Sequence, residues 1–66
     1  MRTLSFKEVK KAIEEGLSLE MCKYKYFGIY TPWKAVSSEV AQHKMNVKVL
    51  DYEGGHFCPY VFRLAE

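Results

Sequence analysis

This sequence has few of the residues that crosslink small proteins or bind metal ions. Its 66 residues include two cysteines and two histidines, at positions Cys22, Cys58, His43 and His56. The cysteines do not form a C-x-x-C motif, and no Cys or His pair has the short ligand spacing of zinc fingers or ribbons. We therefore expect no metal ion and no cofactor. A disulfide between Cys22 and Cys58 is an open alternative, but a reducing compartment favours free, buried thiols.

Long apolar runs and a strong charge bias are also missing. No stretch is long enough to span a membrane, and the start, M-R-T-L-S-F-K-E, lacks the apolar core of a signal peptide. We expect a cytoplasmic location and no membrane partner. Ten Lys and Arg against eight Asp and Glu give a net charge of +2, which is too balanced to predict nucleic-acid binding from charge alone.

The sequence shows no motif typical of catalysis. A nucleophile needs a base and an orienting group beside it. Cys58, His56 and Asp51 are close in sequence, but no Gly-rich loop or helix start accompanies them to form an oxyanion hole. No glycine motif for binding phosphate is present either. We therefore expect no enzymatic activity. The alternative is a hydrolase or a zinc protein that uses Cys58 and His56.

The composition is that of one small globular domain. Hydrophobic residues make up 48% of the chain and charged residues 27%, without low-complexity runs. A chain this short buries a modest fraction of its surface, so its own core gives marginal stability. Aromatic residues, 15% of the total, can fill a core or an interface. We therefore expect a homo-oligomer.

The first predicted element is a helix over residues 6–15. Ser5 and Glu8 have the spacing of a capping box, in which each side chain accepts a hydrogen bond from the other residue's backbone amide. Gly16 is placed to end the helix in a left-handed conformation. Four residues at three- and four-residue spacing form an apolar stripe: Phe6, Val9, Ala12 and Ile13.

After Gly16 apolar and polar residues alternate, which predicts a first strand. The residues on one face are Leu17, Leu19 and Met21, and those on the other are Ser18, Glu20 and Cys22. The alternation weakens towards residue 27, and Gly28 predicts a bulge or turn before a second strand near residues 27–30.

The Thr31-Pro32 pair favours the start of a second helix. With Thr31 as N-cap and Pro32 in the first turn, Trp33, Val36 and Val40 fall on one face. We therefore predict a short helix over residues 33–42.

The sequence pattern of residues 45–64 predicts a β-hairpin. Two runs rich in β-branched and aromatic residues, 45–52 and 57–64, flank Gly54-Gly55, a pair suited to a tight turn. Pro59 cannot donate to a ladder, so its strand should be an edge or carry a bulge there. The predicted register pairs Tyr52 with Phe57, Val49 with Tyr60, Val47 with Phe62 and Met45 with Leu64.

These elements, in the order α-β-β-α-β-β, predict an α+β fold. A small antiparallel sheet carries the N-terminal helix on one face and ends in the C-terminal hairpin.

Residues 23–34 are the main candidate for a binding surface, because five aromatic residues and three lysines interleave there. Flat rings stack on bases and lysines contact phosphates in single-strand and nucleotide binders. If the rings share one face of a strand, however, alternation places the lysines on the other, and the rings also suit a core or an oligomer interface. The candidate binding residues are Lys23, Tyr24, Lys25, Tyr26, Tyr30, Trp33 and Lys34.

Two segments resemble a group of small phage-encoded proteins. Residues 6–16, F-K-E-V-K-K-A-I-E-E-G, are similar to the opening F-x-E-x-x-x-A-hydrophobic-x-x-G of that group, and residues 31–37, T-P-W-K-A-V-S, to its Pro-Trp-x-Ala-x-Ser segment. Together the two segments cover under a third of the chain. Some members are anti-Thoeris proteins, which sequester the host's cyclic ADP-ribose-type immune signal as oligomers. The resemblance implies a phage or mobile-element origin, a host cytoplasm as location, and Trp33 and Lys34 as ligand contacts.

The functional prediction is therefore a small binding protein of phage or mobile-element type that inhibits a host protein or sequesters a host defence signal. The alternative is a nucleotide- or nucleic-acid-binding module that uses the rings for stacking and the lysines for phosphate contacts.

Overall fold

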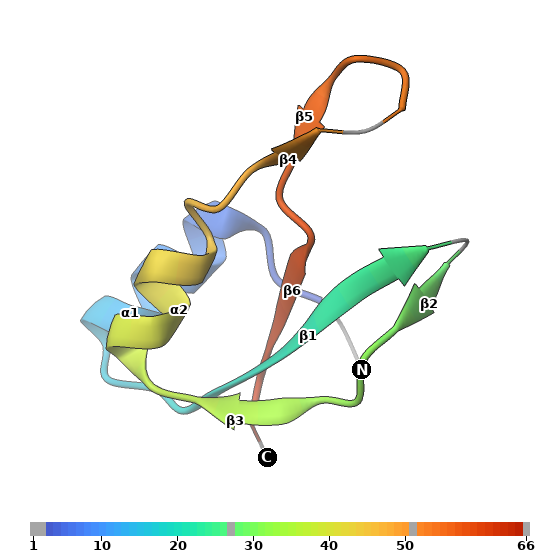
Figure 1. The fold of residues 1–66 in the computed structure, drawn as a ribbon. Helices are drawn as coiled ribbons and strands as arrows, with labels where there is room; N and C mark the ends of the chain where they lie inside the picture. The colour runs from blue at the N-terminus through green and yellow to red at the C-terminus, as the bar shows by residue number, and fades with distance from the viewer. Residues whose placement is uncertain (1–2, 27, 51, 66) are drawn as a thin grey trace.

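The computed structural model describes residues 3–26, 28–50 and 52–65, and it is an α+β fold with small antiparallel sheets. Figure 1 shows the order of elements along the chain. They are α1 (Phe6–Glu14), β1 (Leu19–Tyr26), β2 (Ile29–Tyr30), β3 (Lys34–Val36), α2 (Ser38–Lys44), β4 (Val49–Leu50), β5 (His56–Phe57) and β6 (Tyr60–Leu64).

Helix α1 forms as its local sequence predicts. The Glu8 amide donates to Ser5 Oγ at 3.3 Å, and the Ser5 amide donates to Glu8 Oε1 at 3.0 Å, so the capping box is complete. Gly16 has a φ of 71°, the left-handed conformation that glycine adopts at least cost after a helix end. The helix and both of its predicted ends are confirmed to within one residue.

Strand β1 is the centre of the larger sheet. Along one edge it pairs with β6, with Leu19 opposite Leu64 and Lys23 opposite Tyr60. Along the other edge it pairs first with β3 and then with β2. On the other edge of β6, Leu4 forms an isolated antiparallel bridge with Phe62, in which the Leu4 amide donates to the Phe62 carbonyl at 2.8 Å. The segment beginning near residue 17 is therefore confirmed as a strand, but pairing starts at Leu19.

The predicted helix over residues 33–42 is wrong in its first half. Residues 34–36 form strand β3, and helix α2 begins only at Ser38, after Ser37 as N-cap. Ser37 Oγ accepts from the Val40 amide at 3.2 Å. Thr31 does not cap a helix, because its amide and its Oγ1 both bond the backbone of Lys23, at 2.8 Å each. The order of elements is thus α-β-β-β-α-β-β-β.

The C-terminal hairpin exists, but it is much shorter than predicted and has a different register. Strands β4 and β5 pair Val49 with Phe57 and Leu50 with His56. The turn includes residues 52–55, with Gly54 at a φ of 90°. Tyr52 lies in that turn, so its predicted pairing with Phe57 is wrong; Asp51 lies outside the described residues.

The other three predicted pairs of the hairpin are also wrong. Met45 is the C-cap of α2, so the strand predicted for residues 45–52 is reduced to Val49–Leu50. Beyond Pro59 the chain leaves the hairpin and β6 pairs with β1 instead. Strand β6 forms five residue pairs with β1, and the helices cover one face of this pair of strands. Pairing with β1 therefore buries more apolar surface of β6 than a two-stranded hairpin without helices would.

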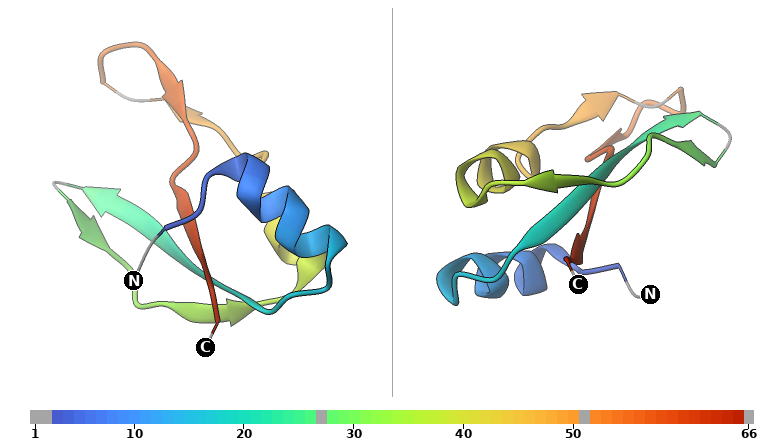
Figure 2. Two further views of the ribbon diagram at one scale, coloured as in Figure 1. Left: turned by 180° about the vertical axis from the view of Figure 1, so that it is seen from behind. Right: turned by 90° about the horizontal axis from the view of Figure 1, so that it is seen from below.

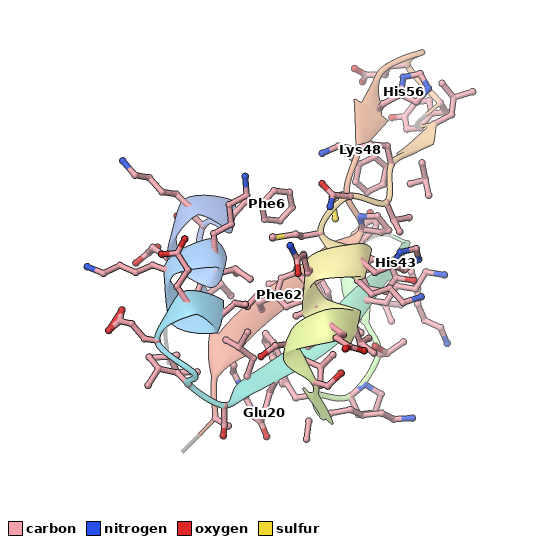
Figure 3. The ribbon with its side chains drawn as sticks, turned by 90° about the vertical axis from the view of Figure 1, so that its left-hand side faces the viewer. Phe6, Glu20, His43, Lys48, His56 and Phe62 are labelled. Carbon is pink, nitrogen blue, oxygen red and sulfur yellow. The ribbon has the colours of Figure 1, made fainter. Side chains whose placement is uncertain are left out.

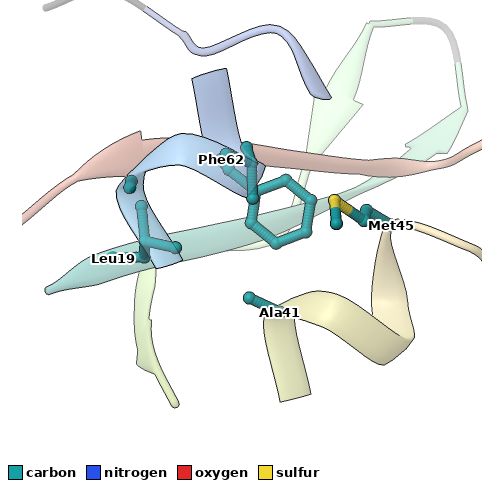
Figure 4. Packing of buried hydrophobic residues seen from close by; sticks show 6 residues of the cluster. Leu19, Ala41, Met45 and Phe62 are labelled. Atoms are coloured by element: carbon teal, nitrogen blue, oxygen red, sulfur yellow. The ribbon is translucent and has the colours of Figure 1, made fainter. Parts of the chain in front are cut away.

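Both helices pack on the same face of the larger sheet, as Figure 3 shows with the helices in front of β1 and β6. The core lies between them and consists of Val9, Ala12, Leu19, Ala41, Met45 and Phe62. In Figure 4 the ring of Phe62 lies between Leu19, Ala41 and Met45. The opposite face of the sheet has no helix over it among the described residues.

Two hairpins extend away from the helices in both views of Figure 2, giving a molecule 36 Å long. One is formed by β1 and β2 and the other by β4 and β5. The Tyr24 amide donates to the Pro59 carbonyl at 2.7 Å and holds the base of the second hairpin against the first.

Candidate functional site

The side chains of β1 divide between the two faces of the sheet. Leu19 and Met21 pack against the helical core, so Glu20, Cys22 and Tyr24 face the other way. Residues directly opposite on an antiparallel pair share a face. The uncovered face of the sheet, which we call the open face, therefore also carries Val61, opposite Cys22, and Arg63, opposite Glu20.

An apolar hollow of about 350 Å³ lies at the hairpin end of the open face. The ring of Tyr24 lines the hollow and meets two other rings edge to face. The ring of Tyr30 is 5.4 Å away and that of Phe57 is 6.0 Å away, measured between centroids. This geometry is favourable for aromatic pairs and holds the three rings in defined orientations. The residues lining the hollow are Tyr24, Tyr30, Phe57, Cys58, Pro59 and Val61.

Arg63 lies beside the hollow and is held by two contacts. Its Nε donates to Glu20 Oε1 at 2.7 Å, and its guanidinium carbon is 4.2 Å from the centre of the Trp33 ring. The stacked ring and the ion pair together fix the guanidinium in one orientation. Cys22, next to Glu20 on this face, is buried; burial raises the pKa of its thiol, and the positive charge of Arg63 partly opposes that rise.

The lysines of the candidate segment are not beside the rings of the hollow. Lys23 lies on the helix side of the sheet, where its ammonium is 6.0 Å from the centre of the Tyr60 ring. The ammonium of Lys44 approaches the same ring at 5.1 Å and the Tyr60 hydroxyl at 3.5 Å. Lys34 pairs with Met21 and so shares the helix side. Alternation thus separates these charges from Tyr24 and Tyr30.

Of the seven candidate residues, the structure brings Tyr24 and Tyr30 together in the hollow and places Trp33 nearby against Arg63. Lys25 is exposed at the point where the register between β1 and β2 shifts. The side chain of Tyr26 lies outside the described part of the structure. Lys23 and Lys34 face away from the hollow.

Sequence reasoning missed several residues of the open face and the hollow, namely Glu20, Phe57, Pro59, Val61 and Arg63. Phe57, Pro59 and Val61 were assigned to one long hairpin strand. No local signal identifies them as neighbours of Tyr24, because the contact depends on β6 pairing with β1 across a long stretch of chain.

Within the described residues, no group of three His, Cys, Asp or Glu side chains is placed to hold a metal ion. Cys22 and Cys58 are free thiols in the structure. Cys58 Sγ donates to the Lys44 carbonyl at 3.4 Å, across from the end of α2. No helix in the described part of the chain is long and apolar enough to cross a membrane.

Comparison with known proteins gives no relative: no family model, no curated protein and no solved structure matches this chain.

Proposed function

We propose that this chain is a non-enzymatic binding protein that inhibits a partner protein, and that the partner docks on the hollow and the two hairpins beside it. The observation that carries the proposal is the concentration of exposed apolar side chains at that end. Ile29 and Tyr30 are each 49% exposed, Leu50 is 66% exposed and Tyr52 is 98% exposed. Exposed apolar patches of this kind mark protein interaction sites.

The distribution of charge favours a protein over a nucleotide as occupant. A nucleotide in the hollow would place phosphates near the rings, where cations are needed. Lys23 and Lys34 lie on the other side of the sheet, and Arg63 is paired at 2.7 Å with the carboxylate of Glu20, which repels a phosphate. Tyrosine and phenylalanine rings around an apolar hollow are, in contrast, typical of the centre of a protein interface.

This proposal keeps the inhibitor function that the phage resemblance implies, with a host protein as the target. Sequestration of a nucleotide signal and self-association through the same rings are its two competitors, since both need the same hollow.

The test compares variants that remove exposed apolar side chains from the hairpins or from elsewhere. Tyr30→Ser and Leu50→Ser change the proposed surface. Val40→Ser on α2 is the matched control, because Val40 is 43% exposed and lies on the helix side. Each protein is used to capture partners from a lysate of the natural host, and the captured protein is then purified and titrated directly.

We expect the purified partner to lose affinity for Tyr30→Ser and Leu50→Ser and to bind Val40→Ser as tightly as the wild type. Equal binding to all three variants would contradict the proposed surface. A wild-type dimer by light scattering that Tyr30→Ser dissociates would assign the surface to self-association instead. A Trp33 fluorescence response to nucleotides that Tyr30→Ser abolishes would assign it to nucleotide binding.

A further inference from the structure

Arg63 has unused hydrogen-bonding capacity on the open face. A guanidinium carries five N–H donors, and the bond to Glu20 uses only the one on Nε. Among the residues that the structure describes, the two terminal Nη groups have no protein partner. The Arg63 side chain is 22% exposed, so it is still accessible from solvent. The Nη groups are the donors that make paired bonds to a carboxylate.

The contacts of Arg63 also prepare it for binding. The Trp33 ring covers one face of the guanidinium at 4.2 Å, and Glu20 fixes the edge that carries Nε. A side chain that is already held in one rotamer loses less conformational entropy when a ligand binds. The free edge of Arg63 is therefore better suited to an anion than the lysines, which lie over the Tyr60 ring on flexible stems.

The position of Arg63 relative to the hollow sets the distance between a carboxylate and an apolar side chain that could bind there together. Arg63 and Val61 are two residues apart on one face of β6, and Val61 lines the hollow. Two residues of a strand span about 7 Å. An extended partner segment has the same repeat, so residues i and i+2 of that segment point to one side at a matching separation.

We propose that Arg63 is a specificity residue that binds a carboxylate of the partner, two residues away from the apolar side chain that enters the hollow. This inference rests on the proposed docking of a protein partner at the hollow. The carboxylate of Glu20 argues for a singly charged ligand group, because it repels any second anion at Arg63 and repels a phosphate dianion more strongly.

The test uses peptides of defined sequence and the protein labelled for nuclear magnetic resonance. The probes are N-acetyl-Phe-Gly-Asp-amide and N-acetyl-Asp-Gly-Phe-amide, which cover both strand directions. Each probe has an analogue in which Asn replaces Asp and removes the charge. Both probes are also compared with the isomer N-acetyl-Phe-Asp-Gly-amide, in which the ring and the carboxylate are on adjacent residues. Binding is followed through the Val61 methyl resonances, which report on the hollow, and the Arg63 Nε–H resonance, which reports on the guanidinium.

We expect one of the two Asp probes to bind about tenfold more tightly than its Asn analogue and than the Phe-Asp-Gly isomer, the size of effect for a charge-assisted hydrogen bond. Arg63→Gln should remove this preference, whereas Lys10→Gln, which removes one positive charge from exposed α1 surface, should preserve it. Glu20→Gln should tighten binding of the Asp probe about threefold, because the repelling carboxylate is gone.

The outcomes separate this inference from the proposed function. Asp and Asn probes that bind the hollow equally would refute the role of Arg63 and leave the hollow as the docking site. Probes that shift neither the Val61 nor the Arg63 resonances would refute both. Because the comparison of Asp with Asn probes uses the wild-type protein, it holds even if Arg63→Gln does not fold.

Discussion

Replacing Phe62 with alanine tests the central arrangement of the fold. Phe62 is 0% exposed, and its ring meets that of Phe6 edge to face at a centroid distance of 6.5 Å. Truncating a buried phenylalanine costs about 3–5 kcal/mol. A chain of 66 residues has a free energy of unfolding of roughly 3–10 kcal/mol. We therefore expect Phe62→Ala to lose about 30% or more of the free energy of unfolding, and to unfold the protein if the cost exceeds that free energy.

Phe57→Ala is the matched control, because Phe57 is the same residue type but is only partly buried at the hollow. Half of the burial energy of a phenylalanine is about 1 kcal/mol. Urea denaturation followed by circular dichroism should therefore separate the two variants by about 2 kcal/mol or more. Phe62→Leu, with an expected cost of about 1 kcal/mol, keeps the comparison possible if Phe62→Ala does not fold.

A double-mutant cycle then tests the register. The structure pairs Phe62 with Met21, whereas the sequence-predicted hairpin pairs it with Val47. Cross-strand neighbours couple by about 0.2–1 kcal/mol. Coupling of Phe62 to Val47 but not to Met21, or equal costs for Phe62→Ala and Phe57→Ala, would refute this reasoning.

Two further predictions concern the N-cap of α2 and the thiols. Ser37→Ala should cost about 1 kcal/mol of stability in urea denaturation, because it removes the hydrogen bond from the Val40 amide. Ser38→Ala, at the next and exposed position, should stay within about 0.5 kcal/mol of wild type. Equal costs for the two variants would contradict the assignment of Ser37 as N-cap. Iodoacetamide should alkylate half-buried Cys58 before buried Cys22, as peptide mass mapping can show. Burial raises the pKa of the Cys22 thiol in the folded state, so the contribution of this thiol to stability is complete below the unfolded-state pKa and is lost as pH rises through the folded-state pKa. Cys22→Ala should remove this loss of stability at alkaline pH. An unchanged profile of stability against pH would contradict the assignment of the loss to Cys22.

The parts of the fold that were predicted correctly depend on short-range signals. Helix α1 follows from Ser5, Glu8 and Gly16, which act within one or two turns of the chain. The helix at residues 33–42 was misplaced because Trp33, Val36 and Val40 fit a helical face, while Val36 equally suits a strand. The competing cap, Ser37, was visible in the sequence and decides the boundary.

The parts that could not be predicted depend on long-range pairing. The pattern of residues 60–64 predicts a strand but does not say whether its partner is β1 or β4. The candidate site has the same limitation. Tyr24, Tyr30 and Trp33 were found from local composition, but their neighbours Phe57 and Arg63 come from a distant segment, and only the paired sheet brings them together.

The pairing of β1 with β6 also constrains when the protein can fold during synthesis. Glu20 and Arg63, which face each other across that pair, are 43 positions apart in sequence. Until β6 has left the ribosome, β1 has one unpaired edge, and Leu19 lacks the Phe62 ring that completes its packing. A nascent chain in this state exposes a strand edge and apolar side chains, which are the features that chaperones bind and that promote aggregation.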